Sequence, residues 1–298
     1  MNKEESNIVA GADIGGSHIT VALVGLTGKC LIEGTSVRRD VNSKGEAKDI
    51  LDSWLFVLKA VLGNADRKVK VNKLAFSMPG PFDYENGISY IKGLDKYEAI
   101  YGLNVREYLA KQLGLEPDNI IFRNDAEAFL HGEVFCGAGR GMGKAIGLTL
   151  GTGFGSAVSD KGLTLDLNLG SEPFKESIAD DYFTTRWFIK RFYELTGIQV
   201  SNVKEMVGLI ELQRLNSSIF DEYADNLSLF LLPFLLKEQP EVIILGGNIA
   251  KAQHLFLDKL KSRLRSSGLD PVFKLAELNE DAALVGAAAS FEPVLLYK

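Results

Sequence analysis

Apolar residues near the start of the chain follow the short runs and alternations that are typical of β-strands. Residues 8–15 form an apolar run that ends at a glycine pair, and residues 19–25 alternate toward a second strand. A turn over residues 27–29 precedes a third stretch at 30–34. Short apolar runs bounded by glycine and polar residues indicate buried strands. The chain is therefore predicted to begin with an antiparallel hairpin and one further strand.

Helical periodicity follows at residues 47–62, where a set of apolar side chains shares one face. These are Ile50, Leu51, Trp54, Leu55, Leu58 and Val61. Residues 71–77 are predicted to form a strand, which is closed by a rigid loop at residues 78–81 because that loop contains two prolines. A helix is predicted at residues 105–113 and a short strand at 119–123.

After Asn124 the theme of strand, glycine-rich turn and helix returns. Helices are predicted at 126–135, 248–264 and 281–291, strands at 144–150, 156–159 and 241–245, and mainly helical structure over 178–236. Residues 137–143 are glycine-rich and form a flexible connection. Two α/β halves, each with a glycine-rich turn, suggest a nucleotide held between two lobes. The boundary is predicted to be a hinge near residue 123.

Composition narrows the class of protein. With 298 residues, of which 46% are hydrophobic, the chain can bury a substantial core. A net charge of −6 without any basic tail argues against a nucleic-acid partner. Cys30 and Cys136 lie far apart and outside any CxxC motif, so neither a disulfide framework nor a zinc module is expected. No segment reads as a secretory signal or is long enough to cross a bilayer, so no membrane partner and a cytoplasmic location are expected.

The DIGGS segment at residues 13–17 lies between the two strands of the predicted hairpin. Gly15 and Gly16 let the backbone approach a phosphate, and with Ser17 they would present N–H groups as an anion-binding nest. The Asp13 carboxylate at the strand end suits Mg²⁺ or its water shell. A tight hairpin turn without a ligand is the alternative for such a segment.

The GTGFG segment at residues 151–155 repeats this device in the second half. It follows a strand and opens another strand, so it matches neither the dinucleotide-binding fingerprint nor the P-loop. The Thr152 hydroxyl adds a donor for a phosphate oxygen. A β-turn is the alternative for this segment alone, but two such turns at corresponding places favour nucleotide binding.

Asn124 and Asp125 stand at a strand end directly before a helix. An acid there can be the general base that accepts a hydroxyl proton while the oxygen attacks a γ-phosphate. Helix capping is the alternative, because Asn and Asp are preferred caps. The position beside the predicted hinge favours catalysis.

Two further sites are less distinctive. Gly246 and Gly247 follow a hydrophobic strand and would let a flat ring or a ribose approach the backbone. The alternative for this pair is a loop that leads into a helix, with Asn248 as the N-cap. Glu172 and Lys175 lie where no periodicity is visible, and a solvated loop is their alternative.

Taken in order, these motifs resemble the ROK family of sugar kinases and sugar-responsive repressors. The set comprises residues 13–17, 77–81, 124–126, 151–155 and 245–247, with the glycine run at 137–143 and the EDAALVGAA segment from Glu280. The resemblance covers essentially the whole chain and implies an α/β, two-domain actin/Hsp70/hexokinase-like (ribonuclease H-like) fold with an inter-domain cleft. Residues 1–122 are predicted as a smaller N-terminal domain, onto which a helix at about 286–298 packs back, and residues 123–285 as a larger C-terminal domain.

The resemblance also implies ATP-dependent phosphorylation of a hexose or N-acetylhexosamine. It assigns the nucleotide's phosphates and Mg²⁺ to Asp13, Gly15, Gly16, Ser17, Gly151, Thr152, Gly153 and Gly155, and the adenosine to Gly246 and Gly247. It assigns the sugar to Gly80, Asn124 and Asp125, with Asp125 as the catalytic base. Sugar and ATP are the implied partners, in a homodimer.

Two departures from the family pattern concern the sugar pocket. The family's Glu-x-Gly-His motif reads Glu172 to Lys175 here, with lysine in place of histidine. No cysteine follows, so the family's zinc loop is missing and no zinc is expected. Glu172 and Asp180 are candidates for sugar contacts, and Lys175, which offers only donors, is expected to alter sugar selectivity.

Other functions stay open at this point. The kinase core begins within ten residues of Met1, which favours the kinase branch over the repressor branch. A non-catalytic or weakly catalytic sugar or nucleotide sensor is the second hypothesis, and a structural ATPase of the actin kind is the third. The particular sugar, the attacked hydroxyl, and ATP or polyphosphate as donor are not distinguished.

Overall fold

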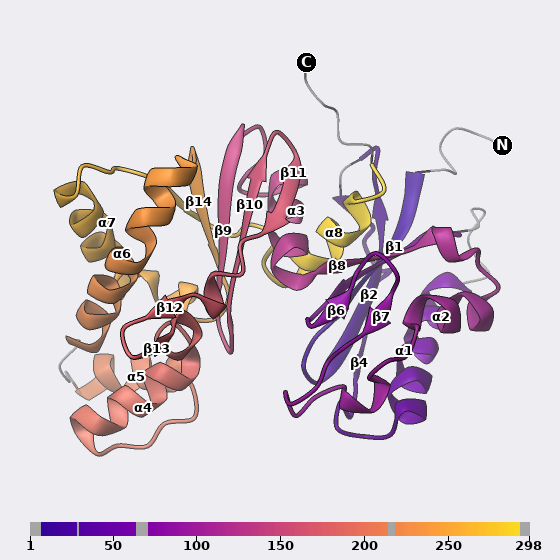
Figure 1. Cartoon of the computed structure of the whole chain (residues 1–298), viewed down its shortest axis with the longest axis horizontal. Helices are drawn as coiled ribbons and strands as arrows, with labels where there is room; N and C mark the ends of the chain where they lie inside the picture. Colours follow the sequence, from indigo (N-terminus) through magenta and orange to yellow (C-terminus); the bar gives the residue numbers. More distant parts are fainter. Residues whose placement is uncertain (1–6, 29, 64–70, 214–217, 293–298) are drawn as a thin grey trace. The chain divides into compact units, whose positions relative to one another are not determined.

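The chain forms two compact units (Figure 1). The computed structural model describes residues 7–28, 30–63, 71–213 and 218–292. Unit 1 comprises residues 1–140 and 280–298, and unit 2 comprises residues 141–279. No helix in the described ranges combines the length and the apolar character needed to cross a membrane.

Unit 1 is built on a six-stranded sheet with the order β3-β2-β1-β5-β8, in which β4 also pairs with β2. The strands are β1 (Ile8–Ile14), β2 (His18–Gly25), β3 (Cys30–Leu31), β4 (Val37–Asp40), β5 (Leu74–Met78) and β8 (Ile120–Asn124). β1 and β2 pair antiparallel, as the sequence predicts, whereas β1, β5 and β8 run parallel. The carboxyl ends of these three strands therefore meet at one edge of the sheet.

The helices of unit 1 are α1 (Ala47–Leu62), α2 (Val105–Leu113), α3 (Asp125–Cys136) and α8 (Ala282–Ala289). The predicted bounds of α1 and α2 are confirmed. All six apolar side chains of the predicted α1 face are buried, because that face packs on the sheet. A small hairpin of β6 (Phe82–Asp83) and β7 (Ile88–Ser89) follows a cis peptide bond at Gly80–Pro81.

The last helix, α8, packs against β1, β5 and α3. Three glycines make this contact as close as backbone atoms allow. A Cβ on Gly11 would lie 2.4 Å from a carbonyl oxygen of α8, and one on Gly132 would lie 2.1 Å from another. A Cβ on Gly286 would lie 1.8 Å from a carbonyl oxygen of α3. Only residues without side chains fit at these three crossings.

Unit 2 contains a five-stranded sheet with the order β11-β10-β9-β14-β15. The strands are β9 (Lys144–Leu150), β10 (Phe154–Asp160), β11 (Leu163–Asp166), β14 (Val242–Gly246) and β15 (Val272–Leu275), with a separate hairpin of β12 (Pro173–Phe174) and β13 (Ser177–Ile178). The helices are α4 (Thr185–Thr196), α5 (Val203–Gln213), α6 (Ser218–Glu238) and α7 (Leu257–Ser266). An aromatic cluster that includes Phe183, Tyr223 and Phe230 fills the core between them.

Short 3₁₀ turns connect these elements. They are η2 (Glu98–Ile100), η3 (Pro117–Asn119), η4 (Leu169–Ser171), η5 (Ala179–Asp181), η6 (Ala250–Leu255) and η7 (Asn279–Asp281). The helix predicted at 248–264 is divided into η6 and α7, because Phe256 leaves helical geometry at φ −133° to bury its ring in the aromatic core. The short edge strands β4, β11 and β15 were not predicted, since each has only four residues, too few for a readable alternation.

The division into units differs from the boundary predicted at residue 123. Residues 124–140 belong with unit 1, because α3 packs along α8 and continues directly from β8 of the unit 1 sheet.

Replacing Gly286 by alanine tests the close helix contact. We expect Gly286→Ala to lower the free energy of unfolding by about 3 kcal/mol, because the added methyl group overlaps the α3 backbone. Gly208→Ala is the matched control, since Gly208 lies within α5 with open space around its Cα and should gain about 0.5–1 kcal/mol. Chemical denaturation of both variants measures the difference. Equal effects of the two substitutions would contradict the packing argument.

Candidate functional site

The hairpin between β1 and β2 carries the DIGGS segment, and side chains from elsewhere in unit 1 hold its carbonyl oxygens. The phenol of Tyr97 donates to the carbonyl oxygen of Gly15 at 2.6 Å. The Ser43 hydroxyl donates to the carbonyl oxygen of Gly16, also at 2.6 Å. Burial raises the pKa of Tyr97, and the nearby Asp13 carboxylate raises it further, so the phenol remains a protonated donor.

The same arrangement leaves N–H groups available on the loop. The backbone N–H of Val41 donates to the carbonyl oxygen of Ser17 at 2.8 Å. Within the described residues, no hydrogen bond is found for the N–H of Gly16 or Ser17, and both residues are exposed. A loop with its carbonyl oxygens held by hydrogen bonds and its exposed N–H groups left without a partner has the features of an anion-binding nest.

Asp13 is the next-to-last residue of β1, directly beside this loop. Burial raises its pKa to about 6, the neighbouring Ser77 hydroxyl partly opposes the rise, and the Asp125 carboxylate adds to it. Ser77 is its partner in the parallel register between β1 and β5. The fold therefore brings the predicted metal-binding carboxylate and the predicted base to the same edge of the unit 1 sheet.

Asn124 serves as the N-cap of α3, which is the alternative that the sequence left open. Its Oδ1 accepts from the N–H of Ala126 at 2.8 Å and of Glu127 at 3.2 Å. Its Nδ2 donates to the hydroxyl of Tyr84 at 3.3 Å. The Oδ1 of Asp125 also accepts from the N–H of Ala126, at 2.8 Å. Capping and a role at the site are compatible, because the cap orients the Asn124 amide and places Asp125 at the start of α3.

Tyr84 is a neighbour of these residues that sequence reasoning missed. Its hydroxyl donates to the carbonyl oxygen of Met78 at 3.0 Å. A Cβ on Gly80 would lie 3.3 Å from this hydroxyl, so Gly80, Tyr84 and Asn124 are contiguous. No motif marks Tyr84 in the sequence; only the β6–β7 hairpin brings it to this place.

In unit 2 the GTGFG segment forms the turn between β9 and β10. Thr152 and Gly153 at its tip are exposed. Gly246 and Gly247 lie beside it: Gly247 has φ +87°, and a Cβ there would lie 2.3 Å from the carbonyl oxygen of Leu150. The two predicted nucleotide segments of unit 2 are thus adjacent, and Gly247 is required by both its backbone angle and its close approach. Asn248 does not cap a helix, since the cap position before η6 is Ile249.

The predicted sugar residues of unit 2 have different surroundings. Glu172 is exposed at the end of η4. The ammonium of Lys175 donates to Oδ1 of Asn226 at 2.7 Å and lies 5.6 Å from the ring centroids of both Phe174 and Tyr182. The lysine therefore has a protein partner and ties the β12–β13 hairpin to α6.

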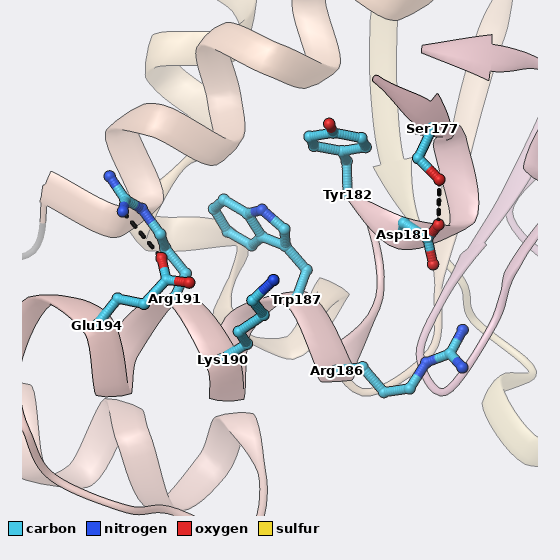
Figure 2. A pocket seen from close by; sticks show the side chains of 8 residues that line it. All are labelled: Ser177, Asp181, Tyr182, Arg186, Trp187, Lys190, Arg191 and Glu194. Carbon is cyan, nitrogen blue, oxygen red and sulfur yellow. Dashed lines mark hydrogen bonds and ion pairs between the residues drawn. The ribbon is translucent and has the colours of Figure 1, made fainter. Parts of the chain in front are cut away.

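A cavity of about 460 Å³ lies beside this hairpin (Figure 2). It is lined by Ser177, Asp181, Tyr182, Arg186, Trp187, Lys190, Arg191 and Glu194. Two of its three cations are already paired: Arg191 binds Glu194 and Glu222, and Arg186 binds Asp180. The cavity is thus nearly balanced in charge.

The carboxylate pair of unit 1 fits a hard divalent cation. The Asp125 carboxylate adds to the cost of ionising Asp13 when no cation is present, and a bound Mg²⁺ would offset that cost. Across the described ranges there is no group of three or more His, Cys, Asp or Glu residues arranged for a metal.

The chain is similar to known proteins in sequence and in fold. The profile of the ROK family matches residues 9–164. The chain is 25% identical to the glucokinase of Thermotoga maritima, over 94% of this chain and 95% of that one. It is 24% identical to the N-acetyl-D-glucosamine kinase of Mannheimia succiniciproducens, over 94% and 98%. The ROK family glucokinase of Streptomyces griseus, solved with glucose and AMPPNP, has the same fold, with a TM-score of 0.73, 19% identity and coverage of 94% and 98%. The predicted fold class is confirmed.

Because the pKa of Asp13 is raised, replacing its carboxyl group by a neutral amide should stabilise the fold, by an amount that depends on pH. A folded-state pKa of about 6, above the ordinary value of 3.8, means that Asp13 favours folding at low pH and that this contribution is lost as the pH rises through 6. Without Mg²⁺, Asp13→Asn should therefore stabilise the protein by up to about 3 kcal/mol at pH 7.5 and by about half as much at pH 5. Denaturant titrations at both pH values measure this. If the difference in unfolding free energy between Asp13→Asn and the wild type is the same at both pH values, the pKa of Asp13 is not raised.

Proposed function

The chain belongs to the ROK family, and on this premise we propose that it is an ATP-dependent sugar kinase that phosphorylates a hydroxyl of a hexose or N-acetylhexosamine. Curated relatives named for glucose and N-acetylglucosamine phosphorylation align with nearly the whole chain and support the reaction class. The observation that carries the proposal is that Asp13 and Asp125 are close enough to interact electrostatically, beside a loop whose N–H groups have no hydrogen-bond partner among the described residues.

In this proposal the residues of unit 1 provide the reacting edge. The N–H groups of Gly16 and Ser17 bind phosphate oxygens, and Asp13 holds Mg²⁺, in part through water. When bound, Mg²⁺ neutralises phosphate charge and orients the nucleotide. Asp125 accepts the proton of the sugar hydroxyl while that oxygen forms a bond to the γ-phosphorus. The bond from the γ-phosphorus to the β–γ bridging oxygen breaks, and ADP leaves with that electron pair.

The remaining predicted residues have supporting parts. Gly151, Thr152, Gly153 and Gly155 form the second phosphate loop, with Gly246 and Gly247 beside the adenosine. Gly80, Asn124 and Glu172 contact the sugar, and Tyr84 orients the Asn124 amide for this purpose. Lys175 affects the sugar indirectly, through the hairpin that it ties to α6. A cytoplasmic homodimer without zinc completes the proposal.

Turnover measured with a panel of sugars tests the proposal. ADP release with glucose, mannose, N-acetylglucosamine and N-acetylmannosamine should depend on at least one sugar. Asp125→Asn should lower kcat by about two to four orders of magnitude, because the amide cannot accept the proton. Asp118→Asn is the control, since Asp118 is exposed and belongs to the turn before β8.

Two outcomes would overturn parts of the proposal. Full activity of Asp125→Asn would show that another group is the base. Sugar binding by the wild-type protein without any turnover would replace the kinase with the second hypothesis, a sugar sensor.

A further inference from the structure

Asp180 contacts the second phosphate loop directly. Its Oδ1 accepts from the backbone N–H of Phe154 at 2.7 Å, and its Oδ2 binds the guanidinium of Arg186 at 2.7 Å. A Cβ on Gly153 would lie 3.6 Å from the same Oδ1, so the carboxylate packs against the tip of the loop. The Asp180 side chain is only 25% exposed. Both of its oxygens thus have partners within the protein.

The first residue of α4, Thr185, holds the other end of the loop. The N–H of Thr185 donates to the carbonyl oxygen of Gly151 at 2.8 Å, and its hydroxyl donates to that oxygen at 3.1 Å. Within the described residues, no hydrogen bond is found for the N–H of Thr152 or Gly153, which lie between the two anchors. The anchors therefore fix the loop with these two N–H groups exposed.

Charge explains why Arg186 accompanies the carboxylate. An isolated carboxylate below a phosphate loop would repel the phosphate. The ion pair with Arg186 makes the anchor nearly neutral while Oδ1 remains the acceptor for Phe154. A group placed to contact the sugar would instead keep an oxygen directed at solvent.

From these contacts we infer that Asp180 is a positioning residue for the nucleotide's phosphates, acting through the loop of residues 151–155, and is not a sugar ligand. The inference rests on the proposed kinase function for its kinetic consequences. The family resemblance makes Asp180 a sugar contact. In this inference, replacing Asp180 weakens the binding of ATP and leaves the binding of the sugar unchanged.

Steady-state kinetics with the full chain separate the two roles. Asp180→Ala should raise the KM for ATP about tenfold or more, because the loop loses a charge-assisted anchor, and leave the KM for the sugar within about twofold. Asp180→Asn should restore much of the ATP affinity, since the amide Oδ1 still accepts from Phe154. Asp181→Ala is the matched control: Asp181 follows in the same turn but bonds to the Ser177 hydroxyl and leaves the loop untouched (Figure 2).

Binding of Mg-AMPPNP, measured by calorimetry, tests the inference independently of turnover. The dissociation constant should rise about tenfold in Asp180→Ala and stay unchanged in Asp181→Ala. A wild-type protein without sugar-dependent turnover would defeat the proposed function, yet the binding result would still decide the role of Asp180. A raised KM for the sugar with unchanged Mg-AMPPNP binding would overturn the inference.

Discussion

The contact of α8 with β1 and α3 is the constraint on which unit 1 depends. Three glycines, Gly11, Gly132 and Gly286, allow backbones to meet where any side chain would collide. The contact sets the place of α3, and so of Asp125 at its first turn, relative to β1, which carries Asp13 near its carboxyl end. Because α8 comes from the end of the chain, this arrangement is complete only after both units have been synthesised.

Both glycine loops follow one physical scheme, although their anchors differ. In unit 1, Tyr97 and Ser43 hold carbonyl oxygens inward; in unit 2, Asp180 accepts an N–H and Thr185 donates to a carbonyl. Each scheme leaves loop N–H groups without a hydrogen-bond partner among the described residues, and in unit 2 the charge of Arg186 is offset by Asp180. A chain with a net charge of −6 can in this way offer sites for an anionic ligand through fixed backbone dipoles.

Prediction from the sequence succeeded where the signal was local and long. The α1 face repeats over 16 residues, enough to define the bounds of the helix. The break at Phe256 was not predicted, because it results from burial of one ring in an aromatic core built by distant helices. The division between units also differs from the prediction, since it depends on packing between α3 and α8, which are separated by more than a hundred positions.

For the site, the local sequence pattern was sufficient to single out the two glycine loops, Asp13 and the Asn124–Asp125 pair. Close backbone approach requires glycines, and a carboxylate at a strand end follows an apolar run, so both can be recognised from a few adjacent residues. The partners of these motifs came only from the folded chain. Tyr97 lies 82 positions from the loop carbonyl that it holds, and Asp180 lies 26 positions from Phe154. No motif marks Tyr97, and the family pattern singled out Asp180 only as a sugar contact. A hydrogen bond across such a separation constrains the position of one atom and leaves its sequence neighbours free to vary.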